Sequence, residues 1–322
     1  MKKVLWMTGL VLLFLMTAGS LFARGQTAAT KQYEIAFSLK TITNDDFQRA
    51  ISESIEKAVK AAGHKFTLVM AGEQTAVATQ VNQVEDLIAK KVSAIILNPM
   101  DSRAVIPVLR KAKEAGIPVI LVDSTIEAGN EDLYITYIGT DNFNAGKVGG
   151  QTLAKALNNA GNVLIVRGAN GSAAGDDRVD GFKEGIKGTG LQIVGEQPGN
   201  WTNSVAMQVT ENMLQANPRV DGLFTASDVM LDGILTALQN ANRGNVKIMA
   251  VDGSRAAVEL IEAGDVFGTM AQFPGRMGPR AVEIIVDVLD GKLNPASVPK
   301  YIDSGTDCYT LQNLSAAKAE MF

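Results

Sequence analysis

Polar side chains that can bind hydroxyl groups stand at five places in this sequence where a short apolar run ends. An ionised carboxylate accepts two hydroxyl hydrogen bonds, while Asn and Arg side chains donate to hydroxyl or ring oxygens. Each of these residues alone could instead cap the helix that follows it. Their recurrence at five run ends favours a shared ligand site. The residues are Ser38, Asn98, Asp123, the pair Ser227 and Asp228, and Asp252.

Signatures of catalysis and of nucleotide binding are weak. The single histidine, His64, falls in a turn after a predicted helix, so a Ser-His-Asp triad or a His-rich zinc site can hardly be assembled. Gly168, Gly171 and Gly175 follow a predicted strand and precede a helix, but their spacing departs from the G-x-G-x-x-G pattern of dinucleotide-binding loops. We therefore predict no catalytic residue, no metal site and no cofactor.

The elements that position these residues alternate between short apolar runs and longer segments of helical period. This pattern indicates an α/β protein with parallel sheets covered by helices on both faces, and it runs through two similar halves. Ligands of such sheets bind outside the carboxyl ends of the strands. The predicted strands are residues 33–38, 65–70, 94–97, 119–122, 137–140, 162–166, 191–196, 222–225 and 246–251. The predicted helices are residues 46–62, 75–90, 101–115, 143–158, 178–187, 204–215, 230–241, 254–262 and 276–289.

The first residues have the three-part layout of a secretory signal. Lys2 and Lys3 precede an apolar run at residues 4–16, and small residues follow it. The predicted signal peptide is residues 1–23, with cleavage after Ala23 favoured over cleavage after Ser20. The apolar run is shorter than the ~20 residues of a membrane anchor. We therefore expect an exported, periplasmic protein.

Charge and cysteine content narrow the partners and the source of stability. Removing Lys2 and Lys3 with the leader leaves 28 basic residues against 34 acidic residues, a formal charge of −6. Nucleic acid is therefore not an expected partner. The single cysteine, Cys308, forms no internal disulfide, so a packed core must stabilise the exported chain.

Several segments together resemble the periplasmic sugar-binding proteins of the ribose-binding type, which serve ATP-driven sugar importers. The resemblance spans nearly the whole mature sequence. It implies a type I periplasmic binding protein fold, with two Rossmann-like lobes joined by crossovers near residues 139–141, 272–274 and 300–304. The expected N-terminal lobe is residues 31–139 plus 273–300, and the C-terminal lobe is residues 140–272 plus 301–322. The segments are IILNPMDSRAV at 95–105, AGIPVILVD at 115–123, YIGTDN at 137–142 with AGK at 145–147, RVDGF at 178–182, AVDG at 250–253 and AQFP at 271–274.

Eight residues match ligand contacts of that family. Phe47 and Trp201 match its stacking aromatic residues, whose rings would cover the apolar C–H faces of a sugar. Arg178 matches the arginine that reaches the ring oxygen or a hydroxyl. The other polar contacts are matched by Asp45, Asn98, Asp123, Asp252 and Gln272, with Asn44 as the alternative to Asp45 if the loop shifts by one residue.

Three departures from the ribose binders add further candidate contacts and change the expected ligand. Ser124 stands where those proteins carry an arginine, Ser227 replaces an asparagine, and Gln48 replaces a second aromatic residue beside Phe47. Each mismatch of a buried polar group costs ~1 to 3 kcal/mol. The pocket is therefore expected to have fewer fixed donors and to bind another pentose, a hexose, a polyol or a cyclitol rather than ribose.

The resemblance implies a monomeric solute-binding protein that closes on a small sugar or polyol and delivers it to an ABC permease, with a chemoreceptor as a further partner. One alternative is the sugar-sensing core of a transcription repressor, which shares this fold. Its sign would be a helix-turn-helix ahead of Tyr33, where the leader stands instead. A chemotaxis-only sugar receptor is another alternative. An enzyme would need a nucleophile and base that the predicted strand ends lack.

Overall fold

The computed structural model describes residues 31–322, and the predicted signal peptide lies outside them. These residues form two six-stranded sheets in which every neighbouring pair is parallel except β10 and β12. In spatial order, the first sheet contains β11 (Tyr301–Asp303), β5 (Tyr137–Gly139), β4 (Val119–Val122), β3 (Ala94–Leu97), β1 (Glu34–Leu39) and β2 (Lys65–Met70). The second contains β12 (Thr306–Thr310), β10 (Gly268–Gln272), β9 (Lys247–Asp252), β8 (Gly222–Thr225), β6 (Ala160–Arg167) and β7 (Gly190–Pro198).

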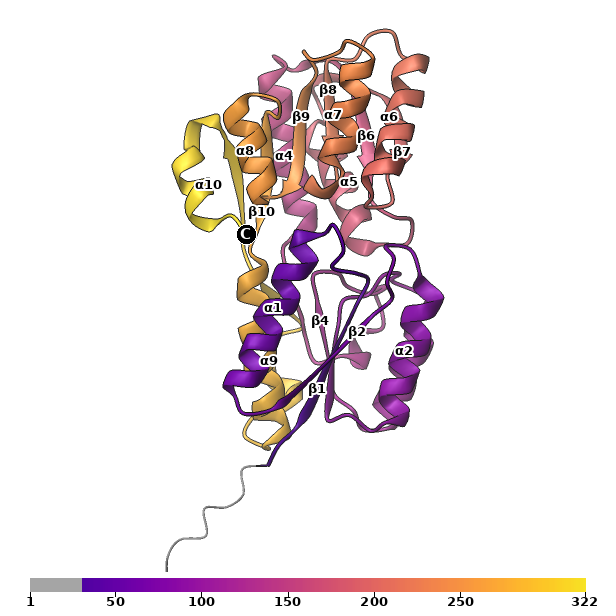
Figure 1. Ribbon diagram of the computed structural model, residues 1–322, viewed down its shortest axis with the longest axis vertical. Coiled ribbons are helices and arrows are strands. Elements are labelled where there is room, and N and C mark those ends of the chain that lie inside the picture. The colour runs from indigo at the N-terminus through magenta and orange to yellow at the C-terminus, as the bar shows by residue number, and fades with distance from the viewer. Residues whose placement is uncertain (1–30) are drawn as a thin grey trace, which may run out of the picture. The chain divides into compact units, whose positions relative to one another are not determined.

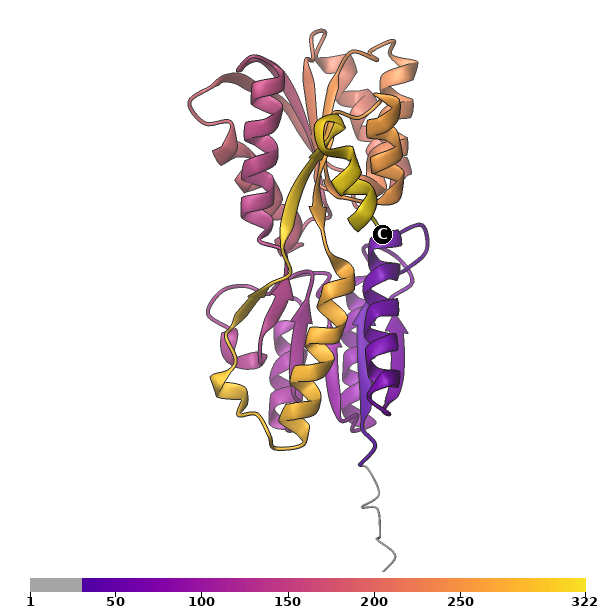
Figure 2. The ribbon, with the colours of Figure 1, turned by 90° about the vertical axis from the view of Figure 1, so that its left-hand side faces the viewer.

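Helices cover both faces of each sheet (Figures 1 and 2). On the first sheet, α1 (Asp46–Ala61) and α9 (Pro274–Leu289) pack on one face, and α2 (Val77–Ala89) and α3 (Ile106–Glu114) pack on the other. On the second sheet, one face carries α4 (Asn142–Ala156) and α5 (Ala173–Gly185). The other face carries α6 (Asn203–Ala216), α7 (Leu231–Asn240) and α8 (Arg255–Ala263), while α10 (Leu314–Glu320) contacts α8. Short 3-10 turns are η1 (Glu131–Leu133), η2 (Asp228–Met230), η3 (Pro295–Ser297) and η4 (Leu311–Asn313).

Burial on both faces explains why the central strands are continuously apolar. All four residues of β3 and of β4 are buried, as expected for parallel strands covered on both sides. Along β1, Ile35 and Phe37 face the layer of α1 and α9, whereas Ala36 faces the layer of α2 and α3. Each sheet therefore has a packed core on each face. Among residues 31–322, no helix is both long enough and apolar enough to cross a membrane.

The chain passes between the two sheets three times, which confirms the predicted fold class and hinge. The crossings follow β5, β10 and β11, at residues 140–141, 273 and 304–305. The lobe boundary predicted after residue 300 needs a correction, because β11 pairs with β5 in the first sheet. The third crossing therefore comes after Asp303, and only the residues beyond it enter the second lobe.

Two helices begin five residues from the predicted position. The segment expected to open a helix at Asp101 forms turns, in which the Asp101 carboxylate accepts hydrogen bonds from the backbone N–H groups of Arg103 and Ala104, and α3 begins only at Ile106. In contrast, α5 begins five residues before Arg178, with Ser172 as its N-cap. Arg178 therefore lies inside α5 rather than at its start.

Candidate functional site

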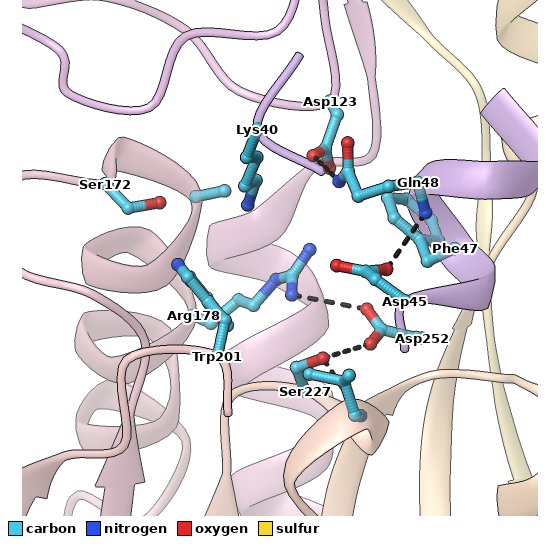
Figure 3. Close-up of a pocket in the computed structure, with 12 residues that line it drawn as sticks. Lys40, Asp45, Phe47, Gln48, Asp123, Ser172, Arg178, Trp201, Ser227 and Asp252 are labelled. Carbon is cyan, nitrogen blue, oxygen red and sulfur yellow. Dashed lines mark hydrogen bonds and ion pairs between the residues drawn. The ribbon is translucent and has the colours of Figure 1, made fainter. Parts of the chain in front are cut away.

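A small cavity lies where the carboxyl ends of the strands of the two sheets meet. It is lined by residues from both lobes (Figure 3). The lining combines three carboxylates, two cations and two aromatic rings. The residues are Lys40, Asp45, Phe47, Gln48, Asp123, Ser172, Ala174, Arg178, Trp201, Ser227, Val229 and Asp252.

The first lobe supplies an amide network around Asp123. The Gln48 Nε2 and Asn98 Nδ2 atoms both donate to Asp123 Oδ2, at 3.0 and 2.8 Å. Asn98 Nδ2 also lies 2.7 Å from Gln48 Oε1. Asp123 directly follows β4 and has a positive φ of 63°. Asp and Asn tolerate this left-handed region better than most residues that carry a side chain. Its other oxygen, Oδ1, is buried and has no hydrogen-bond partner among the described residues.

Asp45 enters the cavity from the N-terminus of α1. Its Oδ1 caps the helix by accepting a hydrogen bond from Gln48 N at 3.0 Å, and its Oδ2 accepts one from Gln74 Nε2 at 2.8 Å. Burial raises the pKa of Asp45, and the nearby Lys40 ammonium opposes that rise. Both carboxylate oxygens already have protein partners, so the local fold fixes the position of this acid.

Arg178 is held in plane by three protein acceptors. Its Nε donates to Asn142 Oδ1 at 2.8 Å, and its Nη1 donates to Ala226 O at 2.7 Å and to Asp252 Oδ1 at 3.3 Å. The helix that carries it packs unusually close to α4, because a Cβ atom on Gly146 would lie only 2.0 Å from the backbone oxygen of Arg178. Close helix packing and three hydrogen bonds therefore fix the guanidinium before any ligand arrives.

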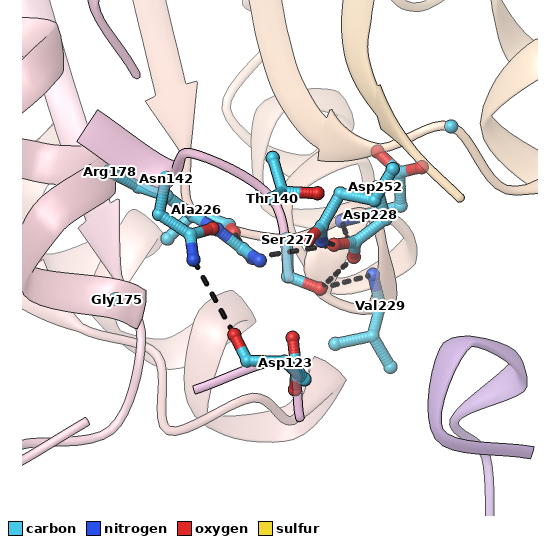
Figure 4. A network of polar contacts seen from close by, with 12 residues as sticks. Asp123, Thr140, Asn142, Gly175, Arg178, Ala226, Ser227, Asp228, Val229 and Asp252 are labelled. Carbon is cyan, nitrogen blue, oxygen red and sulfur yellow. Dashed lines mark hydrogen bonds and ion pairs between the residues drawn. The ribbon is translucent and has the colours of Figure 1, made fainter. Parts of the chain in front are cut away.

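Asp252 anchors the second lobe's polar network (Figure 4). Besides Arg178, it accepts hydrogen bonds from the Ser227 hydroxyl, from Asp228 N at 3.1 Å and from Gln272 Nε2 at 2.7 Å. Asp228 lies behind it, bound by Thr269 and Ser254 rather than lining the main cavity. Burial raises the pKa of both acids; their mutual repulsion adds to this for Asp228, while Arg178 opposes it for Asp252.

The two predicted stacking aromatics stand on different lobes. Phe47 lies at the start of α1 and makes an edge contact with Phe322, with the ring centroids 5.5 Å apart. Trp201 lies in the loop between β7 and α6 and is only 6% exposed. The Lys40 ammonium of the first lobe lies 4.9 Å from the centroid of the Trp201 ring, a cation–π contact between the lobes.

The structure brings most of the predicted contacts to this cavity. Six of the eight line it, while the other two, Asn98 and Gln272, are almost fully buried and donate to the lining carboxylates Asp123 and Asp252. Of the further candidates, Gln48 and Ser227 line the cavity. Ser124 is instead buried, accepting a hydrogen bond from Ala174 N at 3.4 Å. Asn44 lines a neighbouring groove, and not the cavity itself.

Sequence reasoning missed Lys40, Ser172, Ala174 and Val229. The sequence did contain a signal for Lys40, because this residue directly follows β1 and ligands of such sheets bind at the carboxyl ends of the strands. Lys40 is 8% exposed, an unusual degree of burial for a lysine. It brings a second cation to the lining of the cavity beside Arg178.

Backbone contacts also join the lobes beside the cavity. Ser102 N, in the loop after β3, donates to Gly171 O, in the loop after β6, at 2.9 Å. Gly171 has a φ of +84°, and a Cβ atom there would lie 2.1 Å from an Asp101 carboxylate oxygen. The two lobes therefore meet closely in this conformation. Within residues 31–322, no cluster of three or more His, Cys, Asp or Glu side chains is arranged to hold a metal ion.

Two lobes, three crossings and a shared cavity at the strand ends define the class of two-lobed binding proteins. Residues 35–293 match the model of a family described as the periplasmic binding protein domain, and the chain belongs to this family. The ribose import binding protein of Bacillus subtilis (strain 168) is 31% identical over 297 residues, covering 91% of this chain and 95% of that protein.

Solved structures of solute-binding proteins share this fold. An ABC transporter solute-binding protein from Agrobacterium vitis with bound D-fucose is 30% identical with a TM-score of 0.84, covering 90% of this chain and 100% of that one. A periplasmic solute-binding protein from Actinobacillus succinogenes 130z with bound D-allose is 30% identical with a TM-score of 0.80, covering 88% and 100%. The predicted family is confirmed.

Proposed function

We propose that this protein is the extracytoplasmic solute-binding protein of an ABC importer, which captures a monosaccharide or sugar alcohol by hinge closure and delivers it to the membrane permease. The observation that carries the proposal is the cavity shared by the two lobes, with hydroxyl-binding groups and aromatic rings on both sides. The relatives named above bind ribose, allose or fucose according to their descriptions, which supports the same class of ligand.

The ligand is inferred to be neutral and rich in hydroxyl groups. Three buried acceptor atoms around the cavity have no partner among the described residues, and ligand hydroxyls would donate to them. Lys40 and Arg178 donate in return. The cavity's carboxylates, Asp45, Asp123 and Asp252, exceed its two cations by one, which disfavours a sugar acid. The unpartnered atoms are Asn98 Oδ1, Asp123 Oδ1 and Gln272 Oε1.

The donor set favours a ligand other than the one bound by ribose binders. The cation that those proteins place after the first acid is here a buried serine, Ser124, and Lys40 supplies a cation from the end of β1 instead. A cation that approaches from another strand meets a different hydroxyl of the sugar ring. We therefore infer a hexose, a different pentose, a polyol or a cyclitol as the ligand.

Closure is the proposed mechanism. Because contacts come from both lobes, a bound sugar stabilises the closed state over the open state, and its binding energy shifts the population. The closed form would then present both lobes to the permease. We further propose that residues 1–23 act as the cleaved export signal, that the protein works as a monomer, that a chemoreceptor is a second partner, and that the ligand leaves chemically unchanged.

A thermal-shift screen of the mature protein tests the proposal. It should include D-ribose, D-allose, D-fucose, xylitol and myo-inositol, with hits measured by calorimetry and recovered for chemical analysis. At 100 times Kd, a ligand that binds only the folded state adds about 2.7 kcal/mol to stability, which is easily seen as a rise in Tm. Absence of stabilisation by every sugar, polyol and cyclitol tried, or recovery of a chemically altered ligand, would overturn the proposal.

A further inference from the structure

The Trp201 ring lies directly on the backbone of two glycines, Gly168 and Gly175, which we call the glycine floor. A Cβ atom built on Gly168 would lie 2.0, 2.2 and 2.6 Å from ring atoms Cζ2, Cη2 and Cε2. One built on Gly175 would lie 3.0 and 3.1 Å from Cζ2 and Cη2. Such similar distances to three bonded ring carbons place the Gly168 position over the face of the ring rather than beyond its edge.

The loop that carries Trp201 is itself tightly constrained. Asn200 and Trp201 have φ values of 53° and 59°, and two successive side-chain-bearing residues in this region are rare. The loop is tied to the end of β6, because Gly199 N donates to Arg167 O at 2.9 Å. A Cβ atom on Gly199 would also lie 2.5 Å from Met230 Sδ. The ring therefore cannot easily move by bending its own backbone.

The free volume beside the ring belongs to the ligand cavity. Trp201 lines that cavity, and Lys40 of the first lobe approaches the ring there. Carbon atoms in contact are normally about 3.5 Å or more apart, so a side chain on Gly168 would push the ring by about 1.5 Å. With the floor on one face and a constrained loop behind it, the ring would move into the space that a ligand needs.

We propose that the glycine floor is a specificity element: it sets the depth of the Trp201 ring in the cavity and thereby limits the size of the sugar or cyclitol ring that the cavity accepts. The proposal rests on the proposed sugar-binding function. It also gives a role to the glycine-rich segment at residues 168–175, whose spacing does not suit a dinucleotide. Gly168 and Gly175 act through Trp201, as positioning residues, rather than by touching the ligand.

The test compares Gly168→Ala with Gly244→Ala in the mature protein. Gly244 lies in the same lobe, has no heavy atom within 4 Å of its Cβ position and is outside the cavity. We expect Gly168→Ala to weaken binding of D-allose, D-fucose or myo-inositol, whichever binds the parent protein, by about tenfold or more, since the cavity loses depth under a stacked ring. Gly175→Ala, with its longer contacts, should weaken it less. Gly244→Ala should bind as the parent does.

A double-mutant cycle separates this role from a general effect on folding. In a Trp201→Ala background, Gly168→Ala should change affinity by less than about twofold, because the ring that it displaces is gone. An equal loss of affinity with and without the indole would overturn the proposal. Full affinity in Gly168→Ala would overturn it as well.

A fluorescence readout works without any ligand. The chain has two tryptophans, Trp6 and Trp201, and only Trp201 remains once residues 1–23 are removed. Its emission and its quenching by acrylamide should change in Gly168→Ala and stay constant in Gly244→Ala. Unchanged Trp201 emission would contradict the floor even if no sugar bound. A changed emission with no sugar bound by the parent would support the floor and contradict the proposed function, so the two failures are distinguishable.

Discussion

Asp123 and Asp252 are both buried acids at the ends of strands, but the two lobes surround them differently. In the first lobe, two amides donate to one oxygen of Asp123, and the other oxygen has no partner within the part of the chain that the structure describes. In the second lobe, Asp252 accepts four hydrogen bonds, one of them from Arg178. One acid therefore keeps an acceptor for a ligand, whereas the other orients a cation that can donate to it.

This difference suggests a division of labour in ligand binding. Hydroxyl groups that donate would bind the first lobe, where Asp123 lines the cavity and its Oδ1 has no hydrogen-bond partner among residues 31–322. Oxygens that accept would bind Arg178 on the second lobe. Gln48 lines the cavity and also holds Asp123, because its Nε2 donates to Asp123 Oδ2. The predictions below test this division in order of expected effect.

Arg178→Ala should have the largest effect. It removes the charged donor that we propose for the ligand and leaves Asp252 buried without its cation, so we expect about 100-fold weaker binding and a loss of about 3 kcal/mol of stability. Calorimetry and melting curves measure the two effects. Arg167→Ala is the matched control, because its ion pairs with Asp176 and Glu196 are partly exposed and outside the cavity. Retained ligand-induced stabilisation in Arg178→Ala would contradict the assigned role.

Asp123→Asn should weaken binding by about 30-fold while changing stability little. Asn keeps the shape of the side chain and tolerates the positive φ at this position. The contrast with Asp252→Asn sharpens the comparison of the lobes: that change disturbs four hydrogen bonds and should lower Tm more. If Asp123→Asn destabilised the ligand-free protein as much as Asp252→Asn does, the division described above would be wrong.

Lys40→Met should weaken binding by about tenfold, since it removes one charged donor but keeps most of the apolar stem. Restoring the family's arginine with Ser124→Arg in the Lys40→Met background should not recover this affinity, because Ser124 is buried and bonded to Ala174 N. Calorimetry with the parent's own ligand is the measurement. Equal affinity of Lys40→Met and the parent would remove Lys40 from the site.

The buried acids Asp228 and Asp252 of the second lobe should make the free energy of unfolding depend on pH. The pKa of Asp228 is raised to about 8 and that of Asp252 to about 6, chiefly by burial. The folded protein therefore keeps protons that the unfolded chain has released, and stability should fall as pH rises from about 4 to about 8. Melting curves of ligand-free protein across this range should show the fall, and Asp228→Asn should flatten it. An identical slope in that variant would exclude the pair as the cause.

Asn44→Ala should have the smallest effect, below about twofold in affinity. Asn44 lines the neighbouring groove, while Asp45 lines the cavity, so the two alternatives considered for the early polar contact are separated by their positions. Asp45→Asn should lose clearly more affinity than Asn44→Ala when both are measured by calorimetry. A larger loss of affinity in Asn44→Ala than in Asp45→Asn would favour Asn44, rather than Asp45, as the early polar contact.

Much of the fold could be predicted because periodicity and burial agree locally. The bounds of β2, β3, β4 and β8 are those expected from the sequence. For β3, β4 and β8 the reason is burial of every residue, since strands covered on both faces read as short apolar runs. The predicted helix start at Asp101 was wrong, because α3 begins only at Ile106, although Asp101 accepts hydrogen bonds from Arg103 N and Ala104 N as a helix N-cap does. Ser102 N donates to Gly171 O of the other lobe, a contact between distant segments that no local pattern specifies.

By itself, the sequence determined the two α/β halves and the strand ends that carry polar residues, because each follows from a local pattern. A matched motif predicted eight contacts, and six of these residues line the cavity. Only the tertiary structure decided which atoms are available to a ligand. Gln48 and Asn98 occupy one oxygen of Asp123, Lys40 enters the cavity from β1, and Ser124 turns away from it. These outcomes depend on contacts between segments far apart in the chain. No local pattern specifies which of the two carboxylate oxygens of Asp123 will accept hydrogen bonds from distant amides.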